Sequence, residues 1–296
     1  MVFHNFFPDD IIVIIFFMEN VAPSNQTLAS LRWSGLSDVG RFRKNNEDAF
    51  LAVTFDNREL RYLGKIGEGC FDQGDFVFAV SDGMGGAKSG EFASKIAVEN
   101  ITKLLPKSFP LSAQRIDAGL ADVMRELFER IHHAMVDMGR HYEECAGMGA
   151  TLSLCWFMPD WVYFGHIGDS RIYYLPKNGP MVQVSQDHSY VGWLVREGKL
   201  NEREARNHPQ RHALNQVLGA GKKSVEPQIG RIAWEKGDRF LICSDGLIDG
   251  LWDRKIEELA RMDDAQGLLN AVTLVRQSVA DSGRDNTTAL IIEFVE

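Results

Sequence analysis

The chain has few of the features that mark specialised classes of protein. Its 296 residues include only four cysteines, none of them in a Cys-x-x-Cys pair, and two lie within apolar runs. This pattern predicts free, mostly buried thiols and not a disulfide framework. Free thiols are typical of a reducing compartment, so we expect a cytoplasmic protein with free Cys70, Cys145, Cys155 and Cys243.

Long apolar runs are also absent. The most apolar stretch, IIVIIFFM at 11–18, is far shorter than the roughly 20 residues that a membrane-spanning helix needs. Asp9 and Asp10 precede it, where a signal peptide would carry positive charge, so we predict no membrane span. We interpret residues 1–30 as an N-terminal extension and hypothesise that the part before Met18 is not native. A peripheral apolar anchor is the alternative.

An excess of basic residues is missing too. The net charge of −9 argues against a protein that binds nucleic acid or an anionic membrane. The stretch GKIGEGC lacks the spacing of a phosphate-binding P-loop. The composition is that of a globular protein, 45% apolar and 25% charged, without a compositional break. We therefore expect a single domain over residues 31–296.

Short apolar runs alternate with longer amphipathic stretches along this domain. ATLSLCWF (150–157) and WVYFGHIG (161–168) flank a short turn, which predicts an antiparallel hairpin. Helical spacing predicts helices over 89–105, about 112–141 and 265–283. The apolar face of the first helix would comprise Phe92, Ile96, Ile101 and Leu104. Long helices between antiparallel hairpins indicate an α+β fold, in which helices flank a sandwich of sheets.

Acidic residues occur where apolar strands begin or end. FVFAVSDGMGG and FLICSDGLIDG each run from a buried-looking strand into Asp-Gly, which by itself would indicate only a tight turn. Four strand-end sites nevertheless carry carboxylates, namely Glu47/Asp48, Asp82, Asp245 and Asp285. Carboxylates without a His or Cys cluster are typical ligands of hard cations, so the pattern predicts a Mg²⁺ or Mn²⁺ site.

Seven motifs extend this pattern along the chain: SDVGRFRKNNEDAF, SDGMGGAKSGEFAS, MGATLS, HIGDSRIYYL, NHPQRHALNQVLG, FLICSDGLIDG and GRDNTTALIIEF. In their order and spacing, the chain resembles the metal-dependent protein phosphatases of type 2C, in their bacterial form, over about residues 31–296. The resemblance implies a four-layer α-β-β-α sandwich of two mainly antiparallel sheets, with a binuclear metal site at the edge between them. It also implies that phosphoserine and phosphothreonine are hydrolysed by a hydroxide shared between two metal ions.

The same resemblance assigns roles to the acidic residues. Two Mn²⁺ or Mg²⁺ ions per chain would be held by Asp82, Gly83, Asp245 and Asp285 and, through water, by Glu47 and Asp48. Asp82 would bridge the two ions, and the carbonyl oxygen of Gly83 would bind one of them. The carboxylates would then offset the charge of the ions.

Arg43 is the expected phosphate ligand, because its planar guanidinium matches two phosphate oxygens. It lies five residues before Asp48, as the phosphate-binding arginine of the family does. The alternative, a solvated basic face, fits its neighbours Arg41 and Lys44 better than Arg43 itself. With Asp48 and Asp82, Arg43 completes the predicted catalytic set.

The chain departs from the family where a proton donor for the leaving group would be expected. Many bacterial relatives have a histidine at the position of Ala87, and eukaryotic relatives have one at the position of Met84. His188 is one candidate replacement, although a lone loop histidine is more often a surface residue; a metal-bound water is the other. A weak third metal is also left open, because the acidic residues before the MGxT motif, Glu143 and Glu144, lie close to the family's register.

These expectations describe a cytoplasmic, metal-dependent serine/threonine protein phosphatase, which is a phosphoric monoester hydrolase. Its partners would be phosphorylated proteins, either substrates of a Ser/Thr kinase or the kinase itself, and we expect a monomer. The polar segment 186–215, which contains His212, resembles the family's flap beside the site. Two alternatives are a phosphatase-like binding module that has lost its chemistry and an enzyme dedicated to one regulatory partner.

Overall fold

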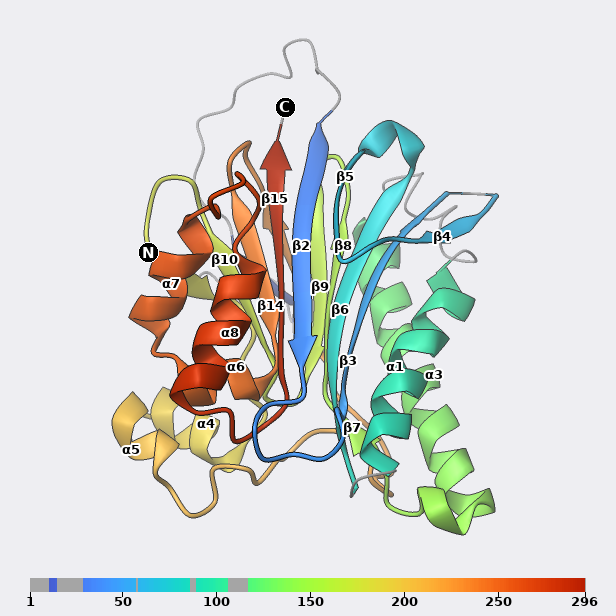
Figure 1. Cartoon of the computed structure of the whole chain (residues 1–296). Coiled ribbons are helices and arrows are strands. Elements are labelled where there is room, and N and C mark those ends of the chain that lie inside the picture. The colour runs from blue at the N-terminus through green and yellow to red at the C-terminus, as the bar shows by residue number, and fades with distance from the viewer. Residues whose placement is uncertain (1–10, 15–28, 57, 86–88, 106–116, 296) are drawn as a thin grey trace.

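Two β-sheets stacked face to face, with helices on both outer faces, form the body of the molecule (Figure 1). The computed structural model describes residues 11–14, 29–56, 58–85, 89–105 and 117–295. Within these residues the four layers run helix, sheet, sheet, helix, so the predicted α-β-β-α sandwich is confirmed.

The larger sheet has the strand order β1-β13-β9-β8-β6-β3-β4, and β7 joins β6 and pairs with β12. Its strands are β1 (Ile11–Ile14), β3 (Asp48–Phe55), β4 (Leu60–Tyr62), β6 (Asp75–Met84), β7 (Gly149–Ala150), β8 (Leu152–Phe157), β9 (Trp161–Ile167), β12 (Leu218–Gly219) and β13 (Gln228–Ala233). The pairing of β1 with β13 is parallel and the others are antiparallel. The β8–β9 pair is the predicted hairpin.

The second sheet has the order β11-β10-β14-β15-β2-β5 and is antiparallel throughout. Its strands are β2 (Ser30–Asp38), β5 (Ile66–Cys70), β10 (Arg171–Leu175), β11 (Val182–Gln183), β14 (Arg239–Cys243) and β15 (Thr287–Val295). The central β2–β15 pair joins the beginning of the described domain to its end over nine residue pairs.

Part of the predicted N-terminal extension belongs to the larger sheet. Residues Ile11–Ile14 form β1, which lies beside β13. Residues 1–10 and 15–28, Met18 included, lie outside the described residues. The hypothesis that the segment before Met18 is not native therefore stays a prediction.

The layers follow from the two-residue alternation of side chains along each strand. In β6, Phe76, Phe78 and Val80 point into the layer between the sheets, whereas Val77 and Ala79 face the helices. Because both faces of this strand are buried, its sequence is continuously apolar. The run that the sequence presents as FVFAV is thus a central strand.

Helices cover the two outer faces of the sandwich. The larger sheet is covered by α1 (Ser89–Leu104) and α3 (Asp117–His141), and the second sheet by α6 (Asp245–Gly250), α7 (Asp253–Arg261) and α8 (Ala271–Asp281). Two short helices, α4 (Tyr190–Arg196) and α5 (Glu202–Arg206), form a lobe beyond one end of the second sheet. In the described part of the chain, no helix has the length and apolar character needed to cross a membrane.

The buried face of α1 differs from the predicted one. Phe92 is 45% exposed, whereas Ala93, Ile96, Ala97, Val98 and Ile101 reach the core and the predicted Leu104 packs against it. The small alanines allow the helix to lie close to the sheet, and Phe92, one residue before this stripe, points away from it. The prediction for Phe92 was therefore wrong.

The predicted helix over 265–283 is shorter than expected, because α8 begins at Ala271. Gly267 has a φ of +77°, which an α-helix does not contain. The carboxylate of Asp264 accepts hydrogen bonds from the backbone N–H groups of Gln266 and Leu268, so a turn replaces the first part of the helix.

All four cysteines are free, as predicted. Cys145, Cys155 and Cys243 are buried, and Cys70 is partly exposed.

The aromatic residues between the sheets predict a strong stability effect. Phe78 is fully buried and contacts the rings of Trp33 and Phe157 at centroid distances of 5.7 and 5.5 Å. Phe78→Ala should lower the free energy of unfolding by about 3–5 kcal/mol, because it leaves a cavity in this layer. The matched control Phe92→Ala, at the exposed position, should change it by less than about 0.5 kcal/mol. Equal losses in urea unfolding would contradict this assignment.

Candidate metal centre

Two of the predicted carboxylates lie opposite each other where the inner strands β3 and β6 of the larger sheet begin and end, respectively. The antiparallel register of β3 and β6 makes Asp48 and Asp82 direct neighbours. Thr151 fixes Asp82 from the other side: its hydroxyl oxygen accepts from the Asp82 N–H at 3.0 Å, and its own N–H donates to the Asp82 carbonyl at 2.8 Å. Neighbouring residues in such a pair are about 4.5–5.5 Å apart at Cα, so the two side chains share one site.

The second sheet supplies the other two acidic positions. Asp245 begins α6, two residues after the end of β14, and Asp285 lies two residues before β15 begins. Since β14 and β15 are antiparallel neighbours, with Cys243 opposite Ala289, the two aspartates come to the same edge. Sequence separation thus gave no guide to their proximity.

Asp48 connects the two sheets directly. It is only 8% exposed, and its Oδ2 accepts hydrogen bonds at 2.7 Å from the hydroxyls of Ser244 and Thr288. Burial raises the pKa of Asp48 to about 6, and the two hydroxyl donors oppose that rise. The carboxylate is therefore held in position by both sheets.

The carboxylates at this edge repel one another. Burial raises the pKa of Asp82 well above its usual range, and the charges of Asp48 and Asp245 raise it further. The pKa of Asp245 is raised in the same way, by burial first and then by the charges of Asp169 and Asp285. A cation at this edge would offset the repulsion.

The donor chemistry of the cluster fits a hard cation. Buried Oδ1 atoms of Asp48 and Asp245 have no hydrogen-bond partner in the described part of the chain. Such oxygens need either a donor or a cation. Within those same residues, no three Asp, Glu, His or Cys side chains converge on one point. The carboxylates are thus a cluster of suitable ligands and not an assembled cage.

Gly83 lies where no side chain could be accommodated. A Cβ atom there would be 1.9 Å from the carbonyl oxygen of Gly90, and one on Gly90 would be 2.9 Å from the Gly83 oxygen and from Cδ of Glu47. The Gly83 N–H donates to the Glu47 carbonyl at 3.1 Å. The two glycines therefore let the start of α1 pack directly on the end of β6, beside Glu47.

Arg43 lies at the cluster, as predicted, but its guanidinium contacts carboxylates. Its Nη2 donates to Asp285 at 2.6 Å, and its Nη1 is 3.8 Å from Glu47. Arg41 and Lys44 are exposed, which agrees with the solvated face expected for them. Because Arg43 is also 46% exposed, its guanidinium can be reached from solvent.

Asn286, which was not predicted from the sequence, positions the loop that carries Arg43. Its Nδ2 donates to the carbonyls of Val39 and Asn45 at 2.9 and 3.0 Å, and its Oδ1 accepts from the Glu47 N–H at 2.7 Å. Ser244 was missed as well. Both residues directly adjoin a predicted acidic residue, which was the available signal.

A further missed residue is Asp169, in the HIGDS motif, two residues after β9 ends. Burial raises its pKa to about 7, and the charge of Asp187 adds to the rise. Together with Asp245 and His212 it lines a cavity of about 410 Å³ beneath α4 and α5. The His212 Nδ1 lies 3.9 Å from the Asp245 carboxylate. Asp169 follows Gly168 at the end of β9, so it resembles the strand-end aspartates that the sequence pattern did reveal.

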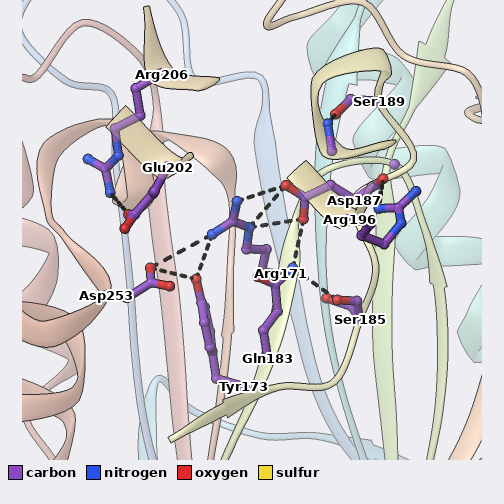
Figure 2. A network of polar contacts seen from close by, with 12 residues as sticks. Arg171, Tyr173, Gln183, Ser185, Asp187, Ser189, Arg196, Glu202, Arg206 and Asp253 are labelled. Carbon is purple, nitrogen blue, oxygen red and sulfur yellow. Dashed lines mark hydrogen bonds and ion pairs between the residues drawn. The ribbon is translucent and has the colours of Figure 1, made fainter. Parts of the chain in front are cut away.

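The lobe that covers this cavity, residues 186–215, is fixed to β10 by Arg171 (Figure 2). The Arg171 guanidinium donates from Nε and Nη2 to Asp187 at 2.9 and 2.8 Å, and from Nη1 to the Tyr173 hydroxyl at 2.9 Å. Gln183 and Arg196 donate to Asp187 as well, at 2.8 and 2.9 Å. The base of the predicted flap is thus an ordered polar network.

His188 lies in a hydrogen-bonded position beside the end of β9. Its Nδ1 accepts a hydrogen bond from the Gly168 N–H at 3.2 Å, and burial lowers its pKa to about 4. This partly buried acceptor does not fit the surface-residue alternative, and its lowered pKa argues against a role as proton donor. Met84 lies partly buried at the end of β6, and Ala87 lies outside the described residues.

Glu143 and Glu144, which left the third metal open, are exposed on the 3₁₀ turn Glu143–Cys145. This turn lies beside the start of α1, where the Ser89 hydroxyl donates to the Glu144 carbonyl at 2.9 Å. The third metal stays open.

Comparisons with known proteins agree with this architecture. The family model described as Protein phosphatase 2C matches residues 67–281. The chain is 29% identical to serine/threonine protein phosphatase PstP of Mycobacterium tuberculosis over 90% of its own length and 45% of that protein's length. It is also 29% identical to protein phosphatase PhpP of Streptococcus pneumoniae, over 88% of this chain and 96% of PhpP. The chain thus spans less than half of PstP but nearly all of PhpP.

Solved structures give the same picture. A crystal structure of the Mycobacterium tuberculosis serine/threonine phosphatase PstP/Ppp superimposes with a TM-score of 0.71 at 30% identity, covering 90% of this chain and all of the other. A structure of the catalytic domain of PstP in complex with two manganese ions gives a TM-score of 0.68 at 27% identity, with the same coverage.

The polar network beneath the lobe predicts a loss of stability when the Arg171 side chain is replaced by an uncharged one. Arg171→Met should lower the free energy of unfolding by about 3 kcal/mol, because it leaves Asp187 buried without its ion pair. The control Arg125→Met, which removes an exposed pair with Asp122, should cost less than about 1 kcal/mol. Urea unfolding of both variants tests this, and similar losses in the two would contradict it.

The raised carboxylate pKa values predict a pH dependence in metal-free buffer. A carboxyl whose pKa is higher in the folded state binds its proton more tightly there, so the fold gains stability as the pH falls through the folded pKa. For Asp48 and Asp169 that range begins at a pKa of about 6 and about 7 and extends down to the unfolded value near about 4.

The pKa of Asp82 is raised as well, so removing the charge of this carboxylate should stabilise the metal-free protein at neutral pH. With EDTA present, Asp82→Asn should unfold at higher urea concentration than the wild type at pH 7, and the difference should shrink by pH 5. A variant less stable than the wild type at pH 7 would contradict the mutual repulsion.

Proposed function

The chain belongs to the protein phosphatase 2C family, and from that premise we propose that it is a serine/threonine protein phosphatase whose active site is the carboxylate cluster. The observation that carries this proposal is the pairing of Asp48 with Asp82 at the edge where Asp245 and Asp285 arrive from the other sheet. The catalytic domain would span residues 31–296, since β2 and β15 pair along their full length.

We propose that the activity depends on two Mn²⁺ or Mg²⁺ ions. Asp82, Gly83, Asp245 and Asp285 would hold them, with Glu47 and Asp48 acting through water. When bound, the ions would neutralise the phosphate dianion and lower the pKa of a water molecule. The solved PstP structure with two manganese ions supports this count by analogy.

The remaining chemistry would come from the side chains of the chain itself. The exposed guanidinium of Arg43 would bind two phosphate oxygens and orient the substrate. Asp48, fixed by Ser244 and Thr288, would hold an attacking water in place and accept its proton.

The substrates would be proteins phosphorylated on serine or threonine, among them a Ser/Thr kinase or the targets of one. The similarity to serine/threonine protein phosphatase PstP and to protein phosphatase PhpP supports this substrate class. The free thiols support a cytoplasmic location. We propose that the catalytic unit acts as a monomer.

Hydrolysis of p-nitrophenyl phosphate tests the proposed reaction. The purified protein should hydrolyse it with Mn²⁺ or Mg²⁺ and lose turnover in EDTA, because the carboxylates need cations to bind a dianion. Turnover on phosphoserine and phosphothreonine peptides should follow the same metal requirement. A folded protein that is inactive with every metal would instead support a binding module.

The bridging role of Asp82 predicts a specific loss. Asp82→Asn should lower kcat with p-nitrophenyl phosphate by about 100-fold or more, while circular dichroism shows an intact fold. Asp56→Asn is a matched control, because Asp56 lies beyond the opposite end of β3, where it only accepts turn hydrogen bonds. Near-normal turnover of Asp82→Asn in purified metal would exclude the bridging assignment.

A further inference from the structure

A basic groove of about 460 Å³ lies beside the candidate metal centre. It is bounded by the loop before β3, by α5, by the α6–α7 junction and by the turn before β15. Five arginines line it: Arg41, Arg203, Arg206, Arg211 and Arg284. Only two acidic residues, Asp249 and Asp281, do so. This excess of positive charge contrasts with the net charge of −9 for the chain.

Several of these arginines keep donors that no protein group uses. Arg203 and Arg284 are exposed, and within the described residues their side chains make no hydrogen bond or ion pair. Among the described residues, the Arg41 guanidinium donates to the carbonyl oxygen of Ser282 alone. Arg206 and Arg211 are partly buried, so Arg203, Arg284 and Arg41 are the arginines that the groove presents to solvent. The groove therefore offers unused donors to an anion.

Two aromatic rings add apolar surface to the groove. Phe42 is 72% exposed and Trp252 is 47% exposed. The Arg206 guanidinium lies 3.8 Å from the centroid of the Trp252 ring and is also paired with Glu202, which fixes its position. Arginine beside exposed aromatic rings is typical of surfaces that bind proteins.

The groove adjoins the residues proposed to bind phosphate. Arg284 directly precedes Asp285, and Arg41 lies two residues before Arg43, whose guanidinium contacts Asp285 at 2.6 Å. Arg211 also lines the cavity that contains Asp245. Consecutive Cα atoms are about 3.8 Å apart. A substrate bound at the centre in an extended conformation would therefore reach the groove about one to three residues away from its phosphorylated residue.

We propose that this groove binds anionic groups of the substrate protein within a few residues of the phosphorylated serine or threonine. These groups are a second phosphate or the carboxylates of Asp and Glu, both of which match the arginine fork. The inference rests on the proposed function and extends it, because it assigns a substrate class: phosphoproteins with an acidic or doubly phosphorylated segment.

The test compares three phosphothreonine peptides that differ only in their flanking residues: neutral, Glu-rich, or carrying a second phosphothreonine two positions away. The groove variant is Arg203→Gln/Arg284→Gln. The matched control, Arg58→Gln/Lys177→Gln, removes the same charge at turns beyond the far ends of β3 and β10. Each protein is also assayed with p-nitrophenyl phosphate, which is too small to reach the groove.

The wild type should have a higher kcat/KM for at least one anionic peptide than for the neutral one. The groove variant should lose about 3- to 10-fold on that peptide. Its turnover of the neutral peptide and of p-nitrophenyl phosphate should not change, and the control should behave as the wild type. A preference for the doubly phosphorylated peptide alone identifies phosphate as the bound group, and a preference for both identifies carboxylates as well.

Equal kcat/KM for all three peptides, an unchanged preference in the groove variant, or the same loss in the control would overturn the proposal. Failure of the proposed function is separable, since every protein would then leave p-nitrophenyl phosphate intact. In that event, fluorescence anisotropy of a labelled Glu-rich peptide still tests the groove. Weaker binding to the groove variant than to the control supports it, and equal binding contradicts it.

Discussion

The packing of two sheets around a layer of large aromatic residues is the constraint on which this structure depends, because it holds carboxylates that repel one another close together. Asp48 and Asp82 are brought together by strand register, and Asp245 and Asp285 by the neighbouring strands of the other sheet. Burial and the neighbouring charges raise the pKa of Asp82 and of Asp245. The close packing of both sheets around large aromatic residues offsets the cost of this repulsion. The apolar core thus stabilises an edge that is unfavourable by itself.

Much of the fold could be predicted from local patterns, and the exceptions have physical causes. The β8–β9 hairpin and the two-sheet architecture follow from alternation and turn residues that act within short segments. The exposure of Phe92 could not be predicted, because helical periodicity defines an apolar face without stating which part of it meets a neighbour. The late start of α8 depends on Asp264, whose side chain competes for backbone N–H groups.

The candidate site was predictable to a similar degree. Each acidic residue at a strand end could be recognised by itself, and the resemblance to the phosphatase family predicted that they form one site. The residues that hold them were not recognised, because Asn286 and Thr288 act across more than 200 residues of sequence. The role of His188 was equally hidden, since only its burial against Gly168 shows that it is a hydrogen-bond acceptor. Long-range contacts of this kind leave no local periodicity.

The pairing of β2 with β15 has a consequence for how the protein is made. These strands are separated by about 250 residues, and the turn before β15 contributes Asp285 and the Asn286 side chain that holds the Arg43 loop. During synthesis, the candidate metal centre cannot form until β15 has emerged and paired with β2. An incomplete chain therefore exposes a sheet edge and an unscreened group of carboxylates but has no assembled centre. Metal binding at this centre would then show that the strands from β2 to β15 have folded together.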